Sequence, residues 1–70
     1  MNYREAARKL STLGCTEIQR RSGGSHRKWT NAAIGRGAVL PDWGSKDLKM
    51  GTVRSTVRKL GIAWQDFLNA

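Results

Sequence analysis

The only histidine in this chain, His26, lies in the stretch GSHRK, which places a hydroxyl and two cations within two residues of the imidazole. A histidine side chain has an ordinary pKa of about 6.5, so it can take up or release a proton near neutral pH. Neighbouring cations can stabilise negative charge that develops on a phosphate. RNA brings its own nucleophile, the ribose 2′-OH, so this set could cleave RNA slowly and without a metal.

Metal-dependent chemistry has little support in the sequence. There is no second histidine and no carboxylate cluster of the kind that metal-assisted hydrolysis uses. One cysteine and one histidine also fall short of the four ligands of a structural zinc site. We therefore expect no metal ion and no other cofactor.

The charge balance indicates a polyanionic partner. Thirteen Lys and Arg face five Asp and Glu in 70 residues, for a formal net charge of +8, and such a field attracts nucleic acid first and an acidic protein second. No apolar run approaches the roughly 20 residues that span a bilayer, and we expect neither a signal peptide nor membrane binding. A single cysteine cannot form an internal disulfide, which fits a reducing cytoplasm.

His26 falls in a predicted β-hairpin. The stretches TEIQRR (16–21) and SHRKWT (25–30) each suit a half-exposed strand, and SGG (22–24) between them suits a tight turn.

Alternation along the second strand decides where the histidine faces. It puts Arg27 and Trp29 on one face and His26, Lys28 and Thr30 on the other. If Trp29 packs inward, His26 points to solvent and is available for chemistry.

Helices are predicted on both sides of the strands. The first is capped by Asn2 and ends at Gly14, with an apolar stripe at spacings of three and four. The second begins near Gly51 and ends at Gly61. Its buried stripe is predicted to comprise Val53, Thr56, Val57 and Leu60.

The remaining segments complete a single small domain over 1–70. AVL (38–40) reads as a third strand that Pro41 stops, after a turn at GRG (35–37). A polar loop (42–50) follows, which Leu48 anchors to the core. The stretch IAWQDFL (62–68) reads as a final helical turn. The side chains expected to pack it on the body are Trp64, Phe67 and Leu68.

These elements predict an α+β fold of order α-β-β-β-α with a short C-terminal helix. The three strands are consecutive and antiparallel, so the helices cover one sheet face and leave the other open. The same order is found in double-stranded-RNA-binding domains, which recognise shape and phosphates more than base sequence. An open, basic sheet face is a candidate binding surface for RNA.

The chain resembles the HicA family of small toxins, the mRNA interferases of HicA–HicB toxin–antitoxin pairs. Matching features run through most of its length: REAARKLSTLGC as first helix, GSH (24–26) opening the second strand, and an aromatic residue at Trp29. VLP ends the third strand, KDLKMGTVRSTVRKLGI (46–62) follows the family pattern, and the WQDFL tail also fits.

The resemblance implies a toxin of a type II toxin–antitoxin pair with a fold like that of double-stranded-RNA-binding domains. It implies endonucleolytic cleavage of mRNA in the cytoplasm. It also implies neutralisation by a cognate HicB-like antitoxin that covers the active face. The active histidine of the family's Gly-Ser-His motif corresponds to His26.

Each candidate site residue has an expected role. His26 is the general base or acid at the 2′-OH or the leaving oxygen, and Lys28 contacts the phosphate. Ser25 orients His26 or closes the turn, and Gly24 permits the turn's backbone conformation. The cations expected to guide the RNA are Arg21, Arg27, Lys46 and Lys49.

Two other functions are compatible with the sequence. A non-catalytic RNA-binding module of the same fold would bind RNA whether or not His26 is present. An interaction protein would use its basic face for an acidic partner and would have little RNA affinity. Both RNA functions predict affinity that falls steeply with salt, with a log–log slope of about −0.7 per single-strand phosphate neutralised.

Overall fold

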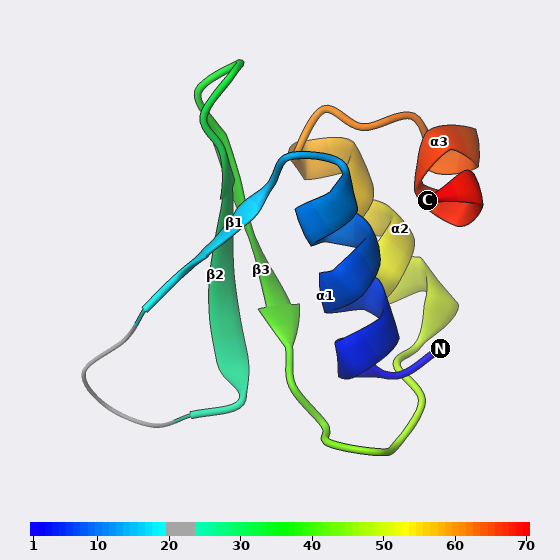
Figure 1. The fold of residues 1–70 in the computed structure, drawn as a ribbon. Helices are drawn as coiled ribbons and strands as arrows, with labels where there is room; N and C mark the ends of the chain where they lie inside the picture. Colours follow the sequence, from blue (N-terminus) through cyan, green and yellow to red (C-terminus); the bar gives the residue numbers. More distant parts are fainter. Residues whose placement is uncertain (20–23) are drawn as a thin grey trace.

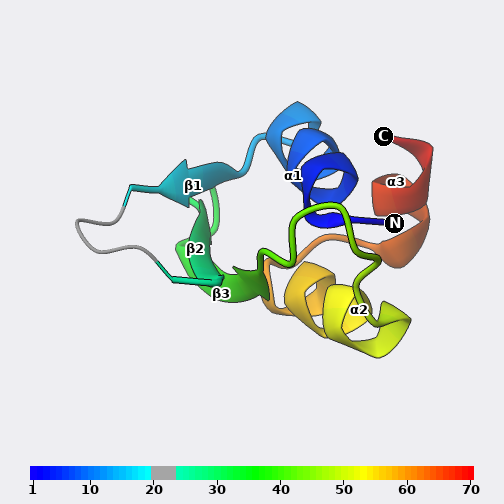
Figure 2. The same cartoon turned by 90° about the horizontal axis from the view of Figure 1, so that it is seen from below.

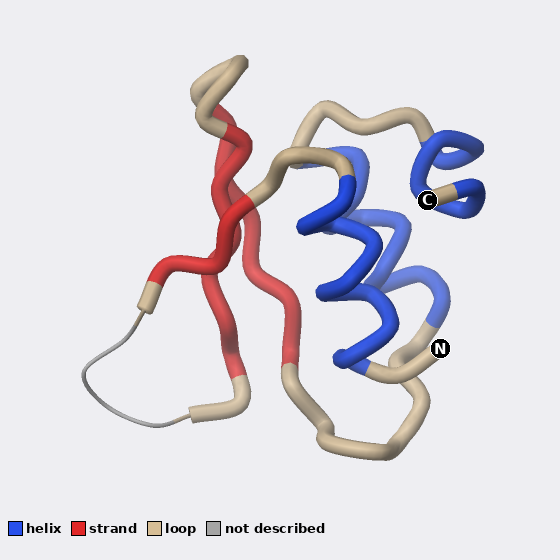
Figure 3. Tube along the Cα trace, viewed as in Figure 1, coloured by secondary structure: helices blue, strands red, loops and turns tan. Residues whose placement is uncertain are grey.

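The computed structural model describes residues 1–19 and 24–70 (Figure 1). The elements are α1 (Tyr3–Thr12), β1 (Thr16–Ile18), β2 (His26–Asn31), β3 (Arg36–Pro41), α2 (Met50–Lys59) and α3 (Trp64–Asn69). The order α-β-β-β-α with a short final helix confirms the predicted α+β class. Figure 3 shows the same path with helices and strands in contrasting colours.

The strands form one antiparallel sheet in the order β1-β2-β3. Glu17 of β1 pairs with Trp29 of β2, which confirms the predicted hairpin. The first strand is shorter than predicted, because β1 ends at Ile18 and Gln19 lies outside it. The rest of the predicted first strand and the first two turn positions (20–23) lie outside the described residues.

The third strand is longer than the sequence suggested. It starts at Arg36, which pairs with Asn31, so the turn lies at 32–35 rather than at GRG. It also includes Pro41, which pairs with His26. Proline is tolerated because β3 is an edge strand, where an amide that faces away from the sheet needs no partner.

The helices cover one face of the sheet and the other face is open, as predicted. Figure 2 shows the sheet on one side of the molecule, with α1 and α2 beside it and α3 beyond them. The apolar core between the two layers consists of Tyr3, Ala6, Leu10, Cys15, Trp29, Ala38, Leu40, Leu48, Val53, Val57, Leu60 and Phe67.

Both long helices end as the sequence predicted. The Asn2 side chain accepts a hydrogen bond from the Glu5 N–H at 3.0 Å and caps α1. Gly14 and Gly61 follow α1 and α2 with φ values of +90° and +73°. Side chains rarely adopt this left-handed conformation, so glycine is the favoured residue at both ends.

The predicted inner face of α2 is confirmed, and it also covers the edge of β3. Val53, Thr56 and Val57 are buried. The Thr56 hydroxyl donates a hydrogen bond to the Val39 carbonyl at 2.8 Å. That carbonyl belongs to the outer edge strand, so α2 satisfies a backbone group that the sheet leaves unpaired.

The final helix packs on the body mainly through one side chain. Phe67 is fully buried, and the Trp64 ring stacks against it at 5.3 Å. The prediction for Leu68 was wrong, because its side chain is 40% exposed. The Lys9 ammonium binds the Leu68 carbonyl at 2.9 Å and lies over the Phe67 ring, which holds α3 with Phe67 toward the core.

Candidate functional site

His26 and Lys28 share the open face of the sheet, as the alternation predicted. They are the first and third residues of β2, and both are exposed. Trp29 points the other way and is only 2% exposed. Alternate residues of a strand lie about 7 Å apart. An acid–base group and an ammonium therefore stand side by side on a surface open to solvent.

The neighbours of these two residues are set by the strand register. His26 lies opposite Pro41 of β3. Lys28 is the middle residue of a cross-strand row, between Ile18 of β1 and Val39 of β3. Ile18 and Val39 are 41% and 46% exposed. The open face thus combines one imidazole and one cation with an apolar flank.

A chain of polar contacts lies beneath β2, on the side that faces the helices. The Tyr3 hydroxyl donates a hydrogen bond to the Glu17 carboxylate and accepts one from the Trp29 indole N–H at 3.1 Å. The Arg27 guanidinium lies 4.0 Å from Glu17 and 3.5 Å from Asp42, each measured to a carboxylate oxygen. These five residues, termed the inner network, join α1, β1, β2 and the loop after β3.

Tyr3 acts as a neutral donor in the inner network. Burial of the phenol, and then its hydrogen bond to Glu17, raise the pKa of Tyr3 well above its usual range. The contribution of this group to folding is complete below the ordinary tyrosine pKa of about 10. It is lost as the pH rises from there toward the pKa of the folded state.

Replacing Tyr3 with phenylalanine should lower the free energy of unfolding by about 1–3 kcal/mol, because it leaves the buried Trp29 N–H without an acceptor. Urea unfolding at neutral pH measures the change. Thr30→Val removes an exposed hydroxyl whose bond to a backbone carbonyl is 3.3 Å long, and this control should stay within about 0.5 kcal/mol of the parent chain. Equal stability of the two variants would show that the hydroxyl of Tyr3 contributes nothing.

Arg27 is not gathered with the other predicted RNA-binding cations. Its guanidinium is engaged by two carboxylates of the inner network, and its side chain is 38% exposed. The sequence already indicated this separation, because alternation along the strand puts Arg27 on the face of Trp29 and not on the face of His26. Its carboxylate partners could not be predicted, because Glu17 and Asp42 lie far from it in the sequence.

Gly24 and Ser25 lead into β2 and are both exposed. Gly24 has a φ of +158°, a backbone conformation that residues with side chains rarely adopt. The Ser25 carbonyl accepts a hydrogen bond from the Asp42 N–H. The residue before His26 is thereby tied to the first residue after β3.

Lys46 and Lys49 are exposed on the loop (42–49) that leaves this same end of the sheet (Figure 1). Leu48 anchors the loop, as predicted: it is 5% exposed, and its N–H donates to the Met1 carbonyl at 2.9 Å. Trp43, which also lies on this loop, is 40% exposed. Arg21 lies outside the described residues.

A hollow of about 350 Å³ lies between this loop and the start of α1. Its lining residues are Asn2, Tyr3, Arg4, Asp42, Gly44 and Ser45. Across 1–19 and 24–70, no three His, Cys, Asp or Glu side chains gather as metal ligands would. In the same ranges, none of the helices combines the length and the apolarity that crossing a membrane requires.

Comparison with known proteins gave one informative result. Neither the curated proteins nor the solved structures contain a match. A family model described as the HicA toxin of bacterial toxin–antitoxin matches residues 3–62. The match runs from the start of α1 to just beyond α2, includes His26 and Lys28, and stops before α3. The chain therefore belongs to the HicA toxin family of bacterial toxin–antitoxin systems.

Proposed function

We propose that this HicA-family toxin is a metal-independent endoribonuclease that cleaves mRNA, with His26 as its acid–base group. The observation that carries the proposal is the placement of His26 and Lys28 side by side on the exposed face of β2. The net charge of +8 supports a polyanionic substrate.

The reaction uses the nucleophile of the RNA itself. The ribose 2′-oxygen attacks the adjacent phosphorus, the bond from phosphorus to the 5′-oxygen breaks, and the products are a 2′,3′-cyclic phosphate and a 5′-hydroxyl. His26 takes the proton from the 2′-OH or gives one to the leaving oxygen, and water exchanges the other proton. Lys28 stabilises the charge on the phosphate oxygens, while Gly24 and Ser25 position the histidine.

The remaining cations divide into two roles. Lys46, Lys49 and Arg21 guide the RNA toward His26 by attracting its phosphates. Arg27 acts by holding β2 in place through its carboxylate partners instead of contacting the substrate.

Membership of the family implies a HicB-type antitoxin as the partner of this toxin. We propose that the antitoxin covers the open sheet face and so blocks His26. The exposed apolar residues beside Lys28, Ile18 and Val39, suit a protein partner on that face. An mRNA substrate would place the pair in the cytoplasm.

The chemistry of the products tests the proposal directly. The purified chain is incubated with a single-stranded RNA in EDTA, beside a matched RNA that carries 2′-deoxyribose at the cleaved nucleotide. We expect cleavage in EDTA, 2′,3′-cyclic phosphate ends, and no cleavage at the deoxy position. Salt-sensitive binding without products would instead identify a non-catalytic RNA-binding module, and a requirement for metal would overturn the mechanism.

A further inference from the structure

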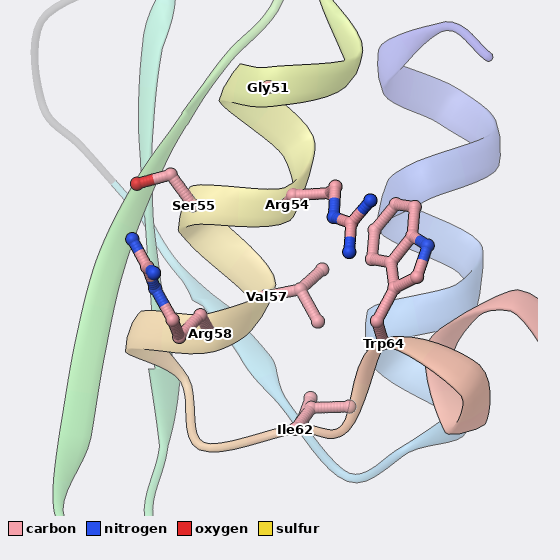
Figure 4. Close-up of a pocket in the computed structure, with 7 residues that line it drawn as sticks. All are labelled: Gly51, Arg54, Ser55, Val57, Arg58, Ile62 and Trp64. Atoms are coloured by element: carbon pink, nitrogen blue, oxygen red, sulfur yellow. The ribbon is translucent and has the colours of Figure 1, made fainter.

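A second hollow, of about 290 Å³, lies along α2 and the segment that follows it (Figure 4). Its lining residues are Gly51, Arg54, Ser55, Val57, Arg58, Ile62 and Trp64. In Figure 4, Arg54 extends toward the Trp64 ring and Arg58 extends toward the opposite side, with Val57 between them and Ile62 on the segment that leads to Trp64. None of the lining residues belongs to β2, so this hollow is separate from the surface that carries His26.

The positive charges around the hollow favour binding of an anion. Arg54 and Arg58 lie one helical turn apart, where like charges repel. Neither forms an ion pair with any carboxylate in the described parts of the chain, whose ion pairs involve Met1 and Arg27. The first turn of α2 contains no acidic residue. A bound carboxylate or phosphate would relieve this repulsion.

The floor of the hollow is apolar, so it also favours binding of an apolar group. Val57 is buried, and Ile62 and Trp64 are half-buried parts of the apolar body. Pockets for drug-sized ligands have volumes of about 300–1,000 Å³. A hollow of about 290 Å³ is therefore suited to one large anchoring side chain.

A nucleobase fits this hollow less well than a peptide side chain does. The Arg54 guanidinium carbon lies 5.1 Å from the centre of the Trp64 ring. The Phe67 ring stacks against the Trp64 ring, with 5.3 Å between the ring centres. A base that stacks on Trp64 would compete with these two partners for the ring. A side chain that enters beside the indole displaces neither.

We propose that the hollow along α2 is a docking site for an acidic peptide segment of a partner protein. One large apolar side chain enters above Val57 and Ile62. Carboxylates that flank it in the partner pair with Arg54 and Arg58, whose planar guanidinium groups match carboxylates in two-point contacts. A buried apolar anchor with polar contacts at its rim is the usual arrangement of an energetically important interface patch.

Synthetic peptides test the site on the whole chain. The probe is the fluorescent peptide Asp-Glu-Leu-Phe-Glu-Asp, and the control peptide replaces Leu-Phe with Ser-Ser at equal charge. We expect the probe to bind at least 10-fold more tightly than the control peptide. Equal binding of the two would overturn the proposal, because it would show attraction by surface charge alone.

Two test variants and one control variant of the protein locate the binding. Arg54→Gln combined with Arg58→Gln should weaken probe binding at least 10-fold, while the matched pair Arg4→Gln and Lys59→Gln removes the same charge elsewhere and should weaken it less than 3-fold. Gly51→Leu should also weaken it at least 10-fold by filling the hollow. A Cβ at Gly51 meets no atom within 4 Å, so this variant should fold.

RNA provides the remaining arm of the test. Cleavage of RNA by these variants should match that of the parent chain, because no lining residue lies on β2. The Arg54→Gln and Arg58→Gln double variant could lose affinity for an RNA hexanucleotide and keep its affinity for the peptide. In that case the hollow is a phosphate site and the proposal fails. If neither the parent chain nor any variant cleaves RNA while the parent chain still binds the peptide, only the ribonuclease function is contradicted.

Discussion

Replacing His26 with alanine should slow RNA cleavage by about 10²–10⁴-fold, the usual contribution of a positioned acid–base group. The chain should still fold, because an exposed side chain outside the core contributes little to stability. It should also still bind RNA, since the cations that attract phosphates remain. Single-turnover cleavage rates and RNA affinities, measured on the same preparations, separate the catalytic effect from the binding effect.

A control on the same face makes this result specific to the imidazole. Thr16 lies exposed on β1 and shares the open face, so Thr16→Ala should cleave RNA at nearly the parent rate. In cells, the parent chain should stop growth and fragment transcripts, whereas His26→Ala should do neither. Unchanged cleavage by a folded His26→Ala chain would remove this residue from the mechanism.

Replacing Phe67 with alanine should lower the free energy of unfolding by about 3–5 kcal/mol, the usual cost of emptying a phenylalanine site in a core. Phe67 is 0% exposed, and both the Trp64 ring and the Lys9 ammonium pack against it. A domain of 70 residues has a total stability of only about 4–10 kcal/mol. The substitution should therefore remove about half of the free energy of unfolding of the parent chain.

The neighbouring residue supplies the control. Leu68 lies on the same helix with its side chain 40% exposed, so Leu68→Ala should change stability by less than about 0.5 kcal/mol. Thermal unfolding followed by circular dichroism compares the two. A small loss for Phe67→Ala would mean that α3 is dispensable. This matters because α3 lies beyond the part of the chain that the family model matches.

Features determined by local periodicity could be predicted from the sequence. The spacing of apolar residues gave both long helices and their buried stripes. Alternation along β2 put His26 and Lys28 on one face and Trp29 on the other, since a strand has only two faces to offer. The glycines after α1 and α2 marked the helix ends for the same local reason.

Features that depend on contacts between distant segments could not be predicted. Pro41 ends a strand in most settings, and its inclusion here depends on β3 being at the sheet edge. Arg27 looked like a free cation because its partners Glu17 and Asp42 are brought to it only by the fold. Leu68 faces solvent because Lys9, from the other end of the chain, fixes the orientation of α3.

The contact between α2 and β3 also bears on how this protein behaves at high concentration. A bare sheet edge can pair with the edge of another molecule and start aggregation. Here the Thr56 hydroxyl occupies the Val39 carbonyl on one edge, at 2.8 Å, and the strand at the other edge, β1, has only three residues. With a net charge of +8 that makes copies repel each other, the sheet offers little opportunity for strand-to-strand growth.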